Sequence, residues 1–477
     1  MKGSEVDPDP YPEVGTEKST KGMDTLTGDP KKAIIKLALP MMFAMSIQTI
    51  YNLVDTFWVS GLGADALAAV GFVFPFFFAS IALSNGLGIG GGSAISRKLG
   101  ARNKHEADNV AVHTMILMLI LVVLFAVPLY FYAETIFTLI GAGETVGLAT
   151  SYGKVIFAGS ILMFFPNVAS AILRSEGDTK RAMNAMVLGS VLNIILDPIM
   201  IYQLDMGIAG AAWATVISLG VSSALMANWL FFRKDTYVSF DFGDFRFDRG
   251  ILRDIFRVGI PASFQQSSMA LMMLIMNIII IYVSNTDAVA VYTVGWRVAT
   301  VAIAPLIGIA TAVITMSGFA FGEQSYDKVS FTHVYATKMG FLVETGIAVL
   351  TFVLAPQIAY AFTMSEGASH ITDDLTVFIR IICIFYPTVS LGLLSSALFQ
   401  GVGKGINALA ATILRALIFV PLFALVFAVV LDMGIIGVWW GMVVGNMLGA
   451  LVIFLWARLY LGNLSEREAA HAAAETA

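Results

Sequence analysis

Long apolar segments separated by short polar stretches fill the chain between residues 31 and 460. Twelve of them are long enough to cross a hydrocarbon core of about 30 Å as helices that rise about 1.5 Å per residue. These segments are 32–60, 66–96, 109–132, 146–173, 180–204, 207–233, 251–283, 288–318, 332–362, 371–400, 405–431 and 434–460. The pattern predicts an all-α polytopic membrane protein with twelve transmembrane helices.

The two ends of the chain lack this pattern. Residues 1–30 are rich in charged residues, Pro and Gly and hold no apolar stretch, which predicts a disordered cytoplasmic tail without a signal peptide. The Ala-rich residues 461–477 are expected to form a second cytoplasmic tail. Between them we expect an N-lobe at 31–233, an inter-lobe linker at 234–250 and a C-lobe at 251–460.

An internal repeat relates the two predicted lobes. Three matches recur at offsets of 221, 221 and 227 residues: Pro40 with Pro261, Pro166 with Pro387, and Leu204–Ile208 with Leu431–Ile435. Because six helices per repeat is an even number, both halves have the same orientation in the membrane. They should therefore be related by a pseudo-twofold axis along the membrane normal, with a binding site between them near the midplane.

Composition supports the membrane assignment. Of the 477 residues 58% are hydrophobic and 13% charged, and the mean hydropathy is +0.82. Soluble proteins have roughly 45–50% apolar and about 25% charged residues, so lipid must be the solvent. The single cysteine, Cys383, excludes an internal disulfide framework and a multi-cysteine metal site. The modest net charge of −5 gives no reason to expect a nucleic-acid partner.

Loop charges predict the orientation of the chain. Acidic residues dominate one set of alternate loops, where the basic residues are Lys154, Arg297 and Arg380. The other set is basic and carries Arg97, Lys98, Arg102, Lys104, Arg174, Lys180, Arg181, Arg233, Lys234, Arg246, Arg249, Arg253, Arg257, Lys328, Lys338, Lys404 and Arg415. Since basic loops stay in the cytoplasm, both termini should be cytoplasmic in a multi-pass protein of the plasma membrane.

Three motifs carry a family resemblance: Tyr-Asn-Leu-Val-Asp-Thr-Phe-Trp-Val at 51–59, Leu-Arg-Ser-Glu-Gly-Asp-Thr at 173–179 and Leu-Asn-Ile-Ile-Leu-Asp-Pro at 192–198. Together with the two-lobe repeat, they resemble the multidrug and toxic compound extrusion (MATE) exporters, especially the DinF-like and archaeal branch. The resemblance implies antiport, in which an inward Na⁺ or H⁺ gradient expels a small, usually cationic organic compound. It implies no cofactor besides the coupling ion.

Two acidic residues lie at membrane depth in the N-lobe. Asp55 and Asp197 precede the ends of the first and fifth predicted helices by five and seven residues, which places both some 8–10 Å below that end. Intramembrane acids are costly and therefore indicate a functional site. Asn193 is one helical turn from Asp197, and Thr215 in the sixth segment reaches a similar depth. The resemblance implies that these four residues surround the coupling cation.

The chemistry of this set leaves the ion open. Carboxylate, amide and hydroxyl oxygens are hard ligands that suit Na⁺, whereas two neighbouring carboxylates in a low dielectric also retain a proton. Alternatively, the amide and hydroxyl groups only hydrogen-bond between packed helices. In the second lobe Met276 stands 221 residues after Asp55, and Gln265 and Gln266 occur near where another MATE branch has an acid. A cation site is therefore not expected there.

A chamber between the lobes is the expected substrate site. Adaptable Met and aromatic walls suit promiscuous cationic compounds through cation–π contacts. The residues expected to contact the substrate are Gln48, Tyr51, Asn167 and Tyr202. We expect a monomer whose other contacts are with membrane lipid.

The positions of three further residues predict their roles. Pro40 and Pro198 each remove a backbone hydrogen bond and should allow their helices to bend. Glu344, six residues after Lys338, is either a second proton site or a side chain that turns to that lysine or to the headgroups.

A lipid-linked saccharide flippase and a membrane-embedded enzyme are the two alternatives to an antiporter. A flippase for lipid-linked saccharides, from the same superfamily, should line its cavity with several cationic residues, whereas Lys154, Arg297 and Arg380 are scattered toward the outer helix ends. A membrane-embedded enzyme needs a catalytic constellation, but Gly-x-Ser-x-Gly, His-Glu-x-x-His and Walker A motifs are absent from the sequence. The sequence therefore favours a transporter that is not an enzyme.

The loop charges generate a test of topology. In a Cys383→Ala background, Asp65→Cys and Glu144→Cys should react with a membrane-impermeant maleimide added to intact cells, whereas Arg102→Cys should react only after permeabilisation. The reverse labelling pattern would contradict the predicted orientation.

Overall fold

The structure is a computed structural model that describes residues 20–233, 235–241, 243, 245–364 and 369–475. These residues form helices and connecting turns, with no strand among them. The first group of helices is α1 (Lys21–Thr27), α2 (Pro30–Ser60), α3 (Ala64–Gly100), α4 (Lys104–Phe131), α5 (Ala133–Leu139), α6 (Val146–Ala158), α7 (Ser160–Ser175), α8 (Thr179–Pro198) and α9 (Gly207–Ala227). The second group is α10 (Arg249–Val283), α11 (Thr286–Gly322), α12 (Tyr326–Phe362), α13 (Thr372–Ile382), α14 (Tyr386–Gly401), α15 (Gly405–Thr412), α16 (Val420–Leu425) and α17 (Gly434–Glu475).

Short 3₁₀ and π-helical turns extend or join these helices. The 3₁₀ turns are η1 (Gly143–Thr145), η4 (Ser369–Ile371) and η5 (Cys383–Phe385), and the π-helical turns are η2 (Ile199–Gln203), η3 (Asn228–Arg233), η6 (Ile413–Phe419) and η7 (Val426–Val430). Eleven helical segments of the described chain are long and apolar enough to span a membrane, and a bent pair makes a twelfth. This pair, 143–158 and 160–175, bends by 44° where a straight helix was expected. The fold is all-α and polytopic, as predicted.

The N-terminal tail is shorter than predicted. Residues 21–27 form α1, and α2 begins at Pro30, although disorder was expected throughout 1–30. The Thr20 side chain caps α1 by accepting from Met23 N–H, and Leu26 is buried in the main core. Met23 also packs against this core, and these apolar contacts and the cap order a segment whose composition indicated disorder. Residues 1–19 lie outside the described residues. At the other end, α17 continues as a helix to Glu475 through most of the expected tail.

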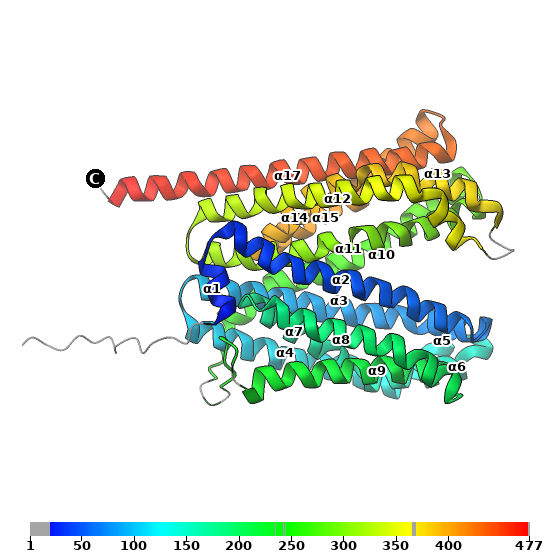
Figure 1. Cartoon of the computed structure of the whole chain (residues 1–477), viewed down its shortest axis with the longest axis horizontal. Coiled ribbons are helices and arrows are strands. Elements are labelled where there is room, and N and C mark those ends of the chain that lie inside the picture. The colour runs from blue at the N-terminus through cyan, green and yellow to red at the C-terminus, as the bar shows by residue number, and fades with distance from the viewer. Residues whose placement is uncertain (1–19, 234, 242, 244, 365–368, 476–477) are drawn as a thin grey trace, which may run out of the picture.

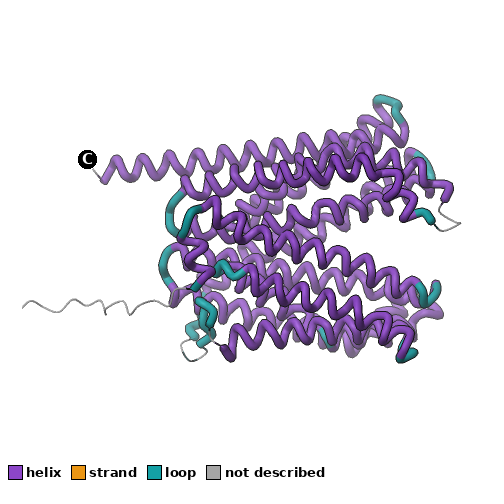
Figure 2. Tube along the Cα trace, viewed as in Figure 1, coloured by secondary structure: helices purple, strands orange, loops and turns teal. Residues whose placement is uncertain are grey.

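The helices form two lobes that lie one above the other in Figure 1, with α2–α9 below and α10–α17 above. Between the lobes α10 packs on α3, and α11 packs on α2. The ribbons diverge toward the end of the bundle opposite α1 (Figure 2). We call the end that carries α1 and the turns 101–103 and 402–404 the α1 end.

The lobes meet at the α1 end through backbone contacts that only small residues permit. A Cβ added at Gly90 of α3 would lie 2.4 Å from the Ile255 carbonyl oxygen of α10. The glycine run 86–92 therefore provides a packing surface for α10. Nearby, Ser93 donates to the Gln400 carbonyl oxygen at 2.5 Å, and Arg97 forms an ion pair with Asp254 at 2.7 Å.

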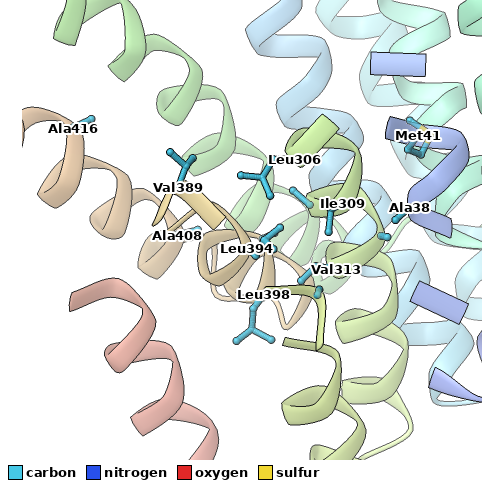
Figure 3. Packing of buried hydrophobic residues seen from close by; sticks show 14 of the residues in the cluster. Ala38, Met41, Leu306, Ile309, Val313, Val389, Leu394, Leu398, Ala408 and Ala416 are labelled. Atoms are coloured by element: carbon cyan, nitrogen blue, oxygen red, sulfur yellow. The ribbon is translucent and has the colours of Figure 1, made fainter. Parts of the chain in front are cut away.

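We call this contact between α3 and α10 the seam. One buried apolar cluster continues from the seam into the C-lobe. Met41 of α2, Ile309 and Val313 of α11, and Leu394 of α14 belong to it, and each is fully buried (Figure 3). Because α11 lies between α2 and α14, it couples the position of the N-lobe to the core of the C-lobe.

Gly90→Ala tests the seam. The added methyl group has no space against α10, so we expect a loss of about 1–3 kcal/mol in stability, as for other overpacked interfaces. The measurement is unfolding of the purified protein in detergent. Gly71→Ala in the same helix is the control, because a Cβ there meets no atom within 4 Å. Equal stability of the two variants would contradict the close-packed seam.

A buried carboxyl group ties the α7–α8 turn to the segment between the lobes. Glu176 is 2% exposed, and its Oε2 accepts from Val238 N–H at 2.8 Å. Burial raises the pKa of Glu176 from 4.5 to about 8, with a smaller upward contribution from Asp178, while the Val238 hydrogen bond and Arg181 act in the opposite direction. The folded protein therefore binds a proton here that the unfolded chain has released.

This pKa shift predicts a pH dependence of stability. Between pH 4.5 and about 8 the folded state holds the Glu176 proton and the unfolded state does not, so stability should fall as pH rises, by at most about 1.4 kcal/mol per pH unit. Glu176→Gln should remove this slope in melting curves recorded from pH 5 to 9, whereas Glu134→Gln, at an exposed position, should keep it. A slope that persists in Glu176→Gln would assign it to other groups.

Candidate ion site and central cavity

The two intramembrane aspartates of the N-lobe lie together. The side chains of Asp55 of α2 and Asp197 of α8 lie next to each other, close enough for a hydrogen bond between the two carboxyl groups. Asp197 is 0% exposed, and its Oδ1 has no hydrogen-bond partner among the described residues. A hydrogen bond between two carboxyl groups requires one proton, because ionised carboxylates only accept. The pair can therefore hold a proton, or a cation in its place.

Asn193 and Thr215 complete one side of this pair. With its amide nitrogen toward Asp197, Asn193 donates to Asp197 Oδ2 at 3.0 Å and accepts from Thr215 N–H at 3.1 Å. The Tyr51 side chain lies beside that of Thr215. The structure thus brings together all four residues predicted for the cation site, and Tyr51 joins them.

Tyr152 of α6 is a further member of the site that the sequence did not reveal. It is close enough to Asp55 and Asp197 for their charges to act on its hydroxyl group. Its helix is the one that bends at residue 159, so its depth and direction could not be judged from a straight span. An intramembrane tyrosine is also a common residue, and nothing in the sequence distinguished this one.

Local chain geometry explains how α8 and α9 approach each other at this site. Pro198 ends α8 and is followed by the π-helical turn η2, a type of irregularity that is frequent at functional sites. A Cβ at Gly210 of α9 would lie 2.5 Å from the Met200 carbonyl oxygen, so the glycine permits close packing of α9 on η2. This packing carries Thr215 to Asn193. Pro40, by contrast, lies inside the continuous helix α2.

A cavity of about 490 Å³ lies between the lobes and receives side chains from both. Of the four residues expected to contact the substrate, Gln48, Tyr51 and Asn167 line it. Tyr202 does not line it, because its hydroxyl group donates to the Trp58 carbonyl oxygen at 2.6 Å near the opposite end of the bundle. Tyr202 lies in the π-helical turn η2, whereas the expected contact with the cavity assumed a regular helix at this position.

The cavity and the ion site share three residues. Tyr51, Asn193 and Thr215 line the cavity and also contact each other or Asp197. Asp55 and Asp197 themselves do not line it. A change in the charge of the carboxyl pair is therefore transmitted to the cavity wall through one layer of side chains.

On the C-lobe side the wall is polar but uncharged near Gln265. Its amide nitrogen donates to the Ala408 carbonyl oxygen at 2.8 Å and to Thr412 Oγ1 at 2.7 Å, and its oxygen accepts from Gln400 at 2.5 Å. Met276, the counterpart of Asp55, is fully buried. This wall has no carboxylate among the described residues.

Two arginines line the cavity that sequence reasoning had assigned to basic loops. Arg174 is in the last turn of α7, and Arg415 is in η6. Arg415 lies ten residues inside the predicted span 405–431, about 15 Å along a helix, so it is an intramembrane cation and not a loop residue. That depth was the signal that could have identified it.

Glu344 occupies a separate position in α12. It is 0% exposed, and neither carboxyl oxygen has a hydrogen-bond partner among the described residues. The alternatives in which it reaches Lys338 or the headgroups are therefore wrong: the carboxyl group lies inside the C-lobe.

Comparison with known proteins agrees with this architecture. The MatE family profile matches residues 40–199 and 261–425, two segments that begin 221 residues apart, the offset of the internal repeat. The chain belongs to the MATE family. Members of this family are transporters, not enzymes, so this MATE protein is a multi-pass membrane transporter.

Individual MATE relatives cover nearly the whole chain. It is 26% identical to the multidrug export protein MepA of Staphylococcus aureus over 431 residues, 89% of this chain and 92% of MepA. A multidrug resistance MATE family transporter solved in an outward-facing conformation is 46% identical, with a TM-score of 0.92 over 94% of this chain and 100% of that one.

A MOP superfamily transporter from Pyrococcus furiosus is 47% identical, with a TM-score of 0.90 at the same coverage. Its structure is described as having a binding pocket of reverse polarity that suggests a different function.

Proposed function

We propose that this MATE protein is a secondary active antiporter that exports small organic compounds across the plasma membrane, coupled to influx of Na⁺ or H⁺. The observation that carries the proposal is the pair of the half-buried Asp55 and the buried Asp197, separated from the central cavity by one layer of side chains. The pair binds the ion, and the cavity binds the cargo. The basic loops at the α1 end support a cytoplasmic orientation of that end.

Both candidate ions fit the donor set. A proton fits because one proton allows the two neighbouring carboxyl groups to hydrogen-bond to each other. Na⁺ fits because the carboxylates, the Thr215 hydroxyl and the Asn193 amide supply hard oxygen ligands. In either case the ion neutralises negative charge that is expensive in the low dielectric of the lobe.

Coupling requires that the ion binds one conformation of the transporter better than the other. The flexible part of the site is the junction of Pro198 with η2, where the α-helical hydrogen-bond pattern is already interrupted. When Asp197 is neutralised, its carboxyl group needs less stabilisation from the hydrogen bonds that Asn193 and Thr215 provide, so these two side chains can rearrange. Those two residues line the cavity, so its shape responds to the ion.

The cargo predicted from the resemblance is an organic cation. MepA is named a multidrug export protein, which supports a broad range of organic compounds. The wall of the cavity suits such breadth, because Met45, Met186, Met269 and Met272 are flexible side chains that repack around different ligands. One monomer contains both sites.

Asp197→Asn tests the coupling. The substitution removes one ionisable group at nearly constant shape, so efflux driven by an imposed Na⁺ or H⁺ gradient in proteoliposomes should fall to the level of protein-free vesicles. Asp65→Asn, at an exposed position of α3, is the matched control and should keep wild-type efflux. Undiminished gradient-driven efflux by a monodisperse Asp197→Asn protein would remove this residue from the mechanism.

A further inference from the structure

The charge of the central cavity does not match a cationic cargo. Arg174 lines it from the N-lobe and Arg415 from the C-lobe, and no Asp or Glu of the described chain lines it. The acids of the ion site are set apart from it, because Asp55 is five residues from the far end of α2 while Arg174 is in the last turn of α7 at the α1 end. The cavity therefore carries two positive charges.

Neither arginine has a negative partner in the described structure. Arg174 donates to the hydroxyl group of Ser170, and Arg415 donates to the side-chain oxygen of Asn446 at 3.2 Å. The ion pairs of the described residues involve neither of them. Each guanidinium carries five N–H donors and a full charge, and such a group is costly at membrane depth without a compensating anion.

The geometry of a guanidinium selects the kind of anion that compensates it. Its planar fork of N–H groups matches the two oxygens of a carboxylate, phosphate or sulfonate in a bidentate arrangement. The remaining wall includes Trp296, Phe385 and several methionines, which bind an apolar body. A volume of about 490 Å³ falls within the range of small-molecule sites, about 300–1,000 Å³.

We infer that the cargo of this cavity is a small amphipathic organic anion, whose oxyacid head binds Arg174 and Arg415 and whose apolar body lies against the Met and aromatic wall. This inference rests on the proposed function for the role of the cavity as cargo site, and it replaces the organic cation expected from the resemblance. A bound anion supplies the charge that the two lobes lack.

The first experiment compares three ligands with the same tail. Binding of octyl phosphate, octyltrimethylammonium and octyl glucoside to the purified full-length protein is measured by calorimetry in a neutral detergent, with no ion gradient. Octyl phosphate should bind at least about tenfold more tightly than the other two, the difference expected for a charge-assisted hydrogen bond. Equal or tighter binding of octyltrimethylammonium would overturn the inference.

Substitutions of the arginines locate the binding. Arg415→Gln and Arg174→Gln should each weaken octyl phosphate at least about tenfold and leave octyl glucoside unchanged. Arg415→Lys keeps the positive charge and should retain part of the affinity for octyl phosphate. If Arg415→Gln does not fold, the reduced affinity of Arg415→Lys still tests the role of Arg415. Arg380→Gln is the control, because that arginine lies over the Phe352 ring, outside the cavity, and should bind as wild type. Unchanged binding in both Gln variants would overturn the inference.

The outcome is independent of coupling. Binding of octyl phosphate is measured on the wild-type protein without an ion gradient, whereas coupling is measured as gradient-driven efflux by wild type and Asp197→Asn. A failure of coupling and a failure of cargo class therefore give different results.

Two transport assays distinguish a water-soluble anion from an anionic lipid as the cargo. Proteoliposomes are tested for gradient-driven export of carboxyfluorescein, a water-soluble anion, and for translocation of a short-chain fluorescent phosphatidic acid between leaflets. Transport of either probe supports the inference if Arg415→Gln reduces it and Arg380→Gln does not. The probe that is transported shows whether the cargo is a soluble compound or a lipid. Transport of neither, in vesicles that export an organic cation, would overturn it.

Discussion

The constraint on which this transporter depends is the placement of two carboxyl groups beside each other inside lipid. Asp55 and Asp197 cannot both be ionised without a cation, since their repulsion is nearly unscreened there. The surroundings respond to this requirement: Asn193 donates to Asp197, Thr215 orients Asn193, and the break at Pro198 allows the chain to place the acid without a regular helix on its far side. In the proposed function an ion neutralises this pair, and the site then responds to an ion gradient.

The two lobes have the same helical plan but divide the chemistry between them. Where the first half has Asp55, the second has the buried Met276, and Gln265 forms a network of neutral hydrogen bonds with Gln400 and Thr412. One lobe can therefore change charge while the other remains constant. Glu344 is the exception in the C-lobe, but it lies away from the cavity wall and contributes no charge to it.

Sequence alone predicted the features that follow from periodicity and burial. The spans follow from hydropathy and the repeat from residues matched at nearly one offset, whereas the grouping of Asp55 with Asp197 came from their shared depth together with the family resemblance. The sequence did not predict what depends on bends and short contacts: the 44° bend of the fourth span brought Tyr152 to the candidate ion site, and α1 is ordered by a cap and by the packing of Met23 and Leu26. Arg415 was expected in a basic loop from the sign of its charge alone, although its position ten residues inside the span 405–431 places it within the membrane.

The position of Arg174 links cargo to conformation in addition to charge. Its carbonyl oxygen accepts from Thr315 of α11 at 3.3 Å, so this residue lies where the lobes meet. A ligand held by Arg174 and Arg415 bridges the two lobes, and separation of the lobes at the α1 end would stretch or break one of its two contacts. Its affinity must then differ between the two conformations, which is the condition for cargo to bias the equilibrium. In the proposed antiport, ion and cargo therefore act on the same rearrangement from opposite sides of one layer of residues, without needing to touch each other.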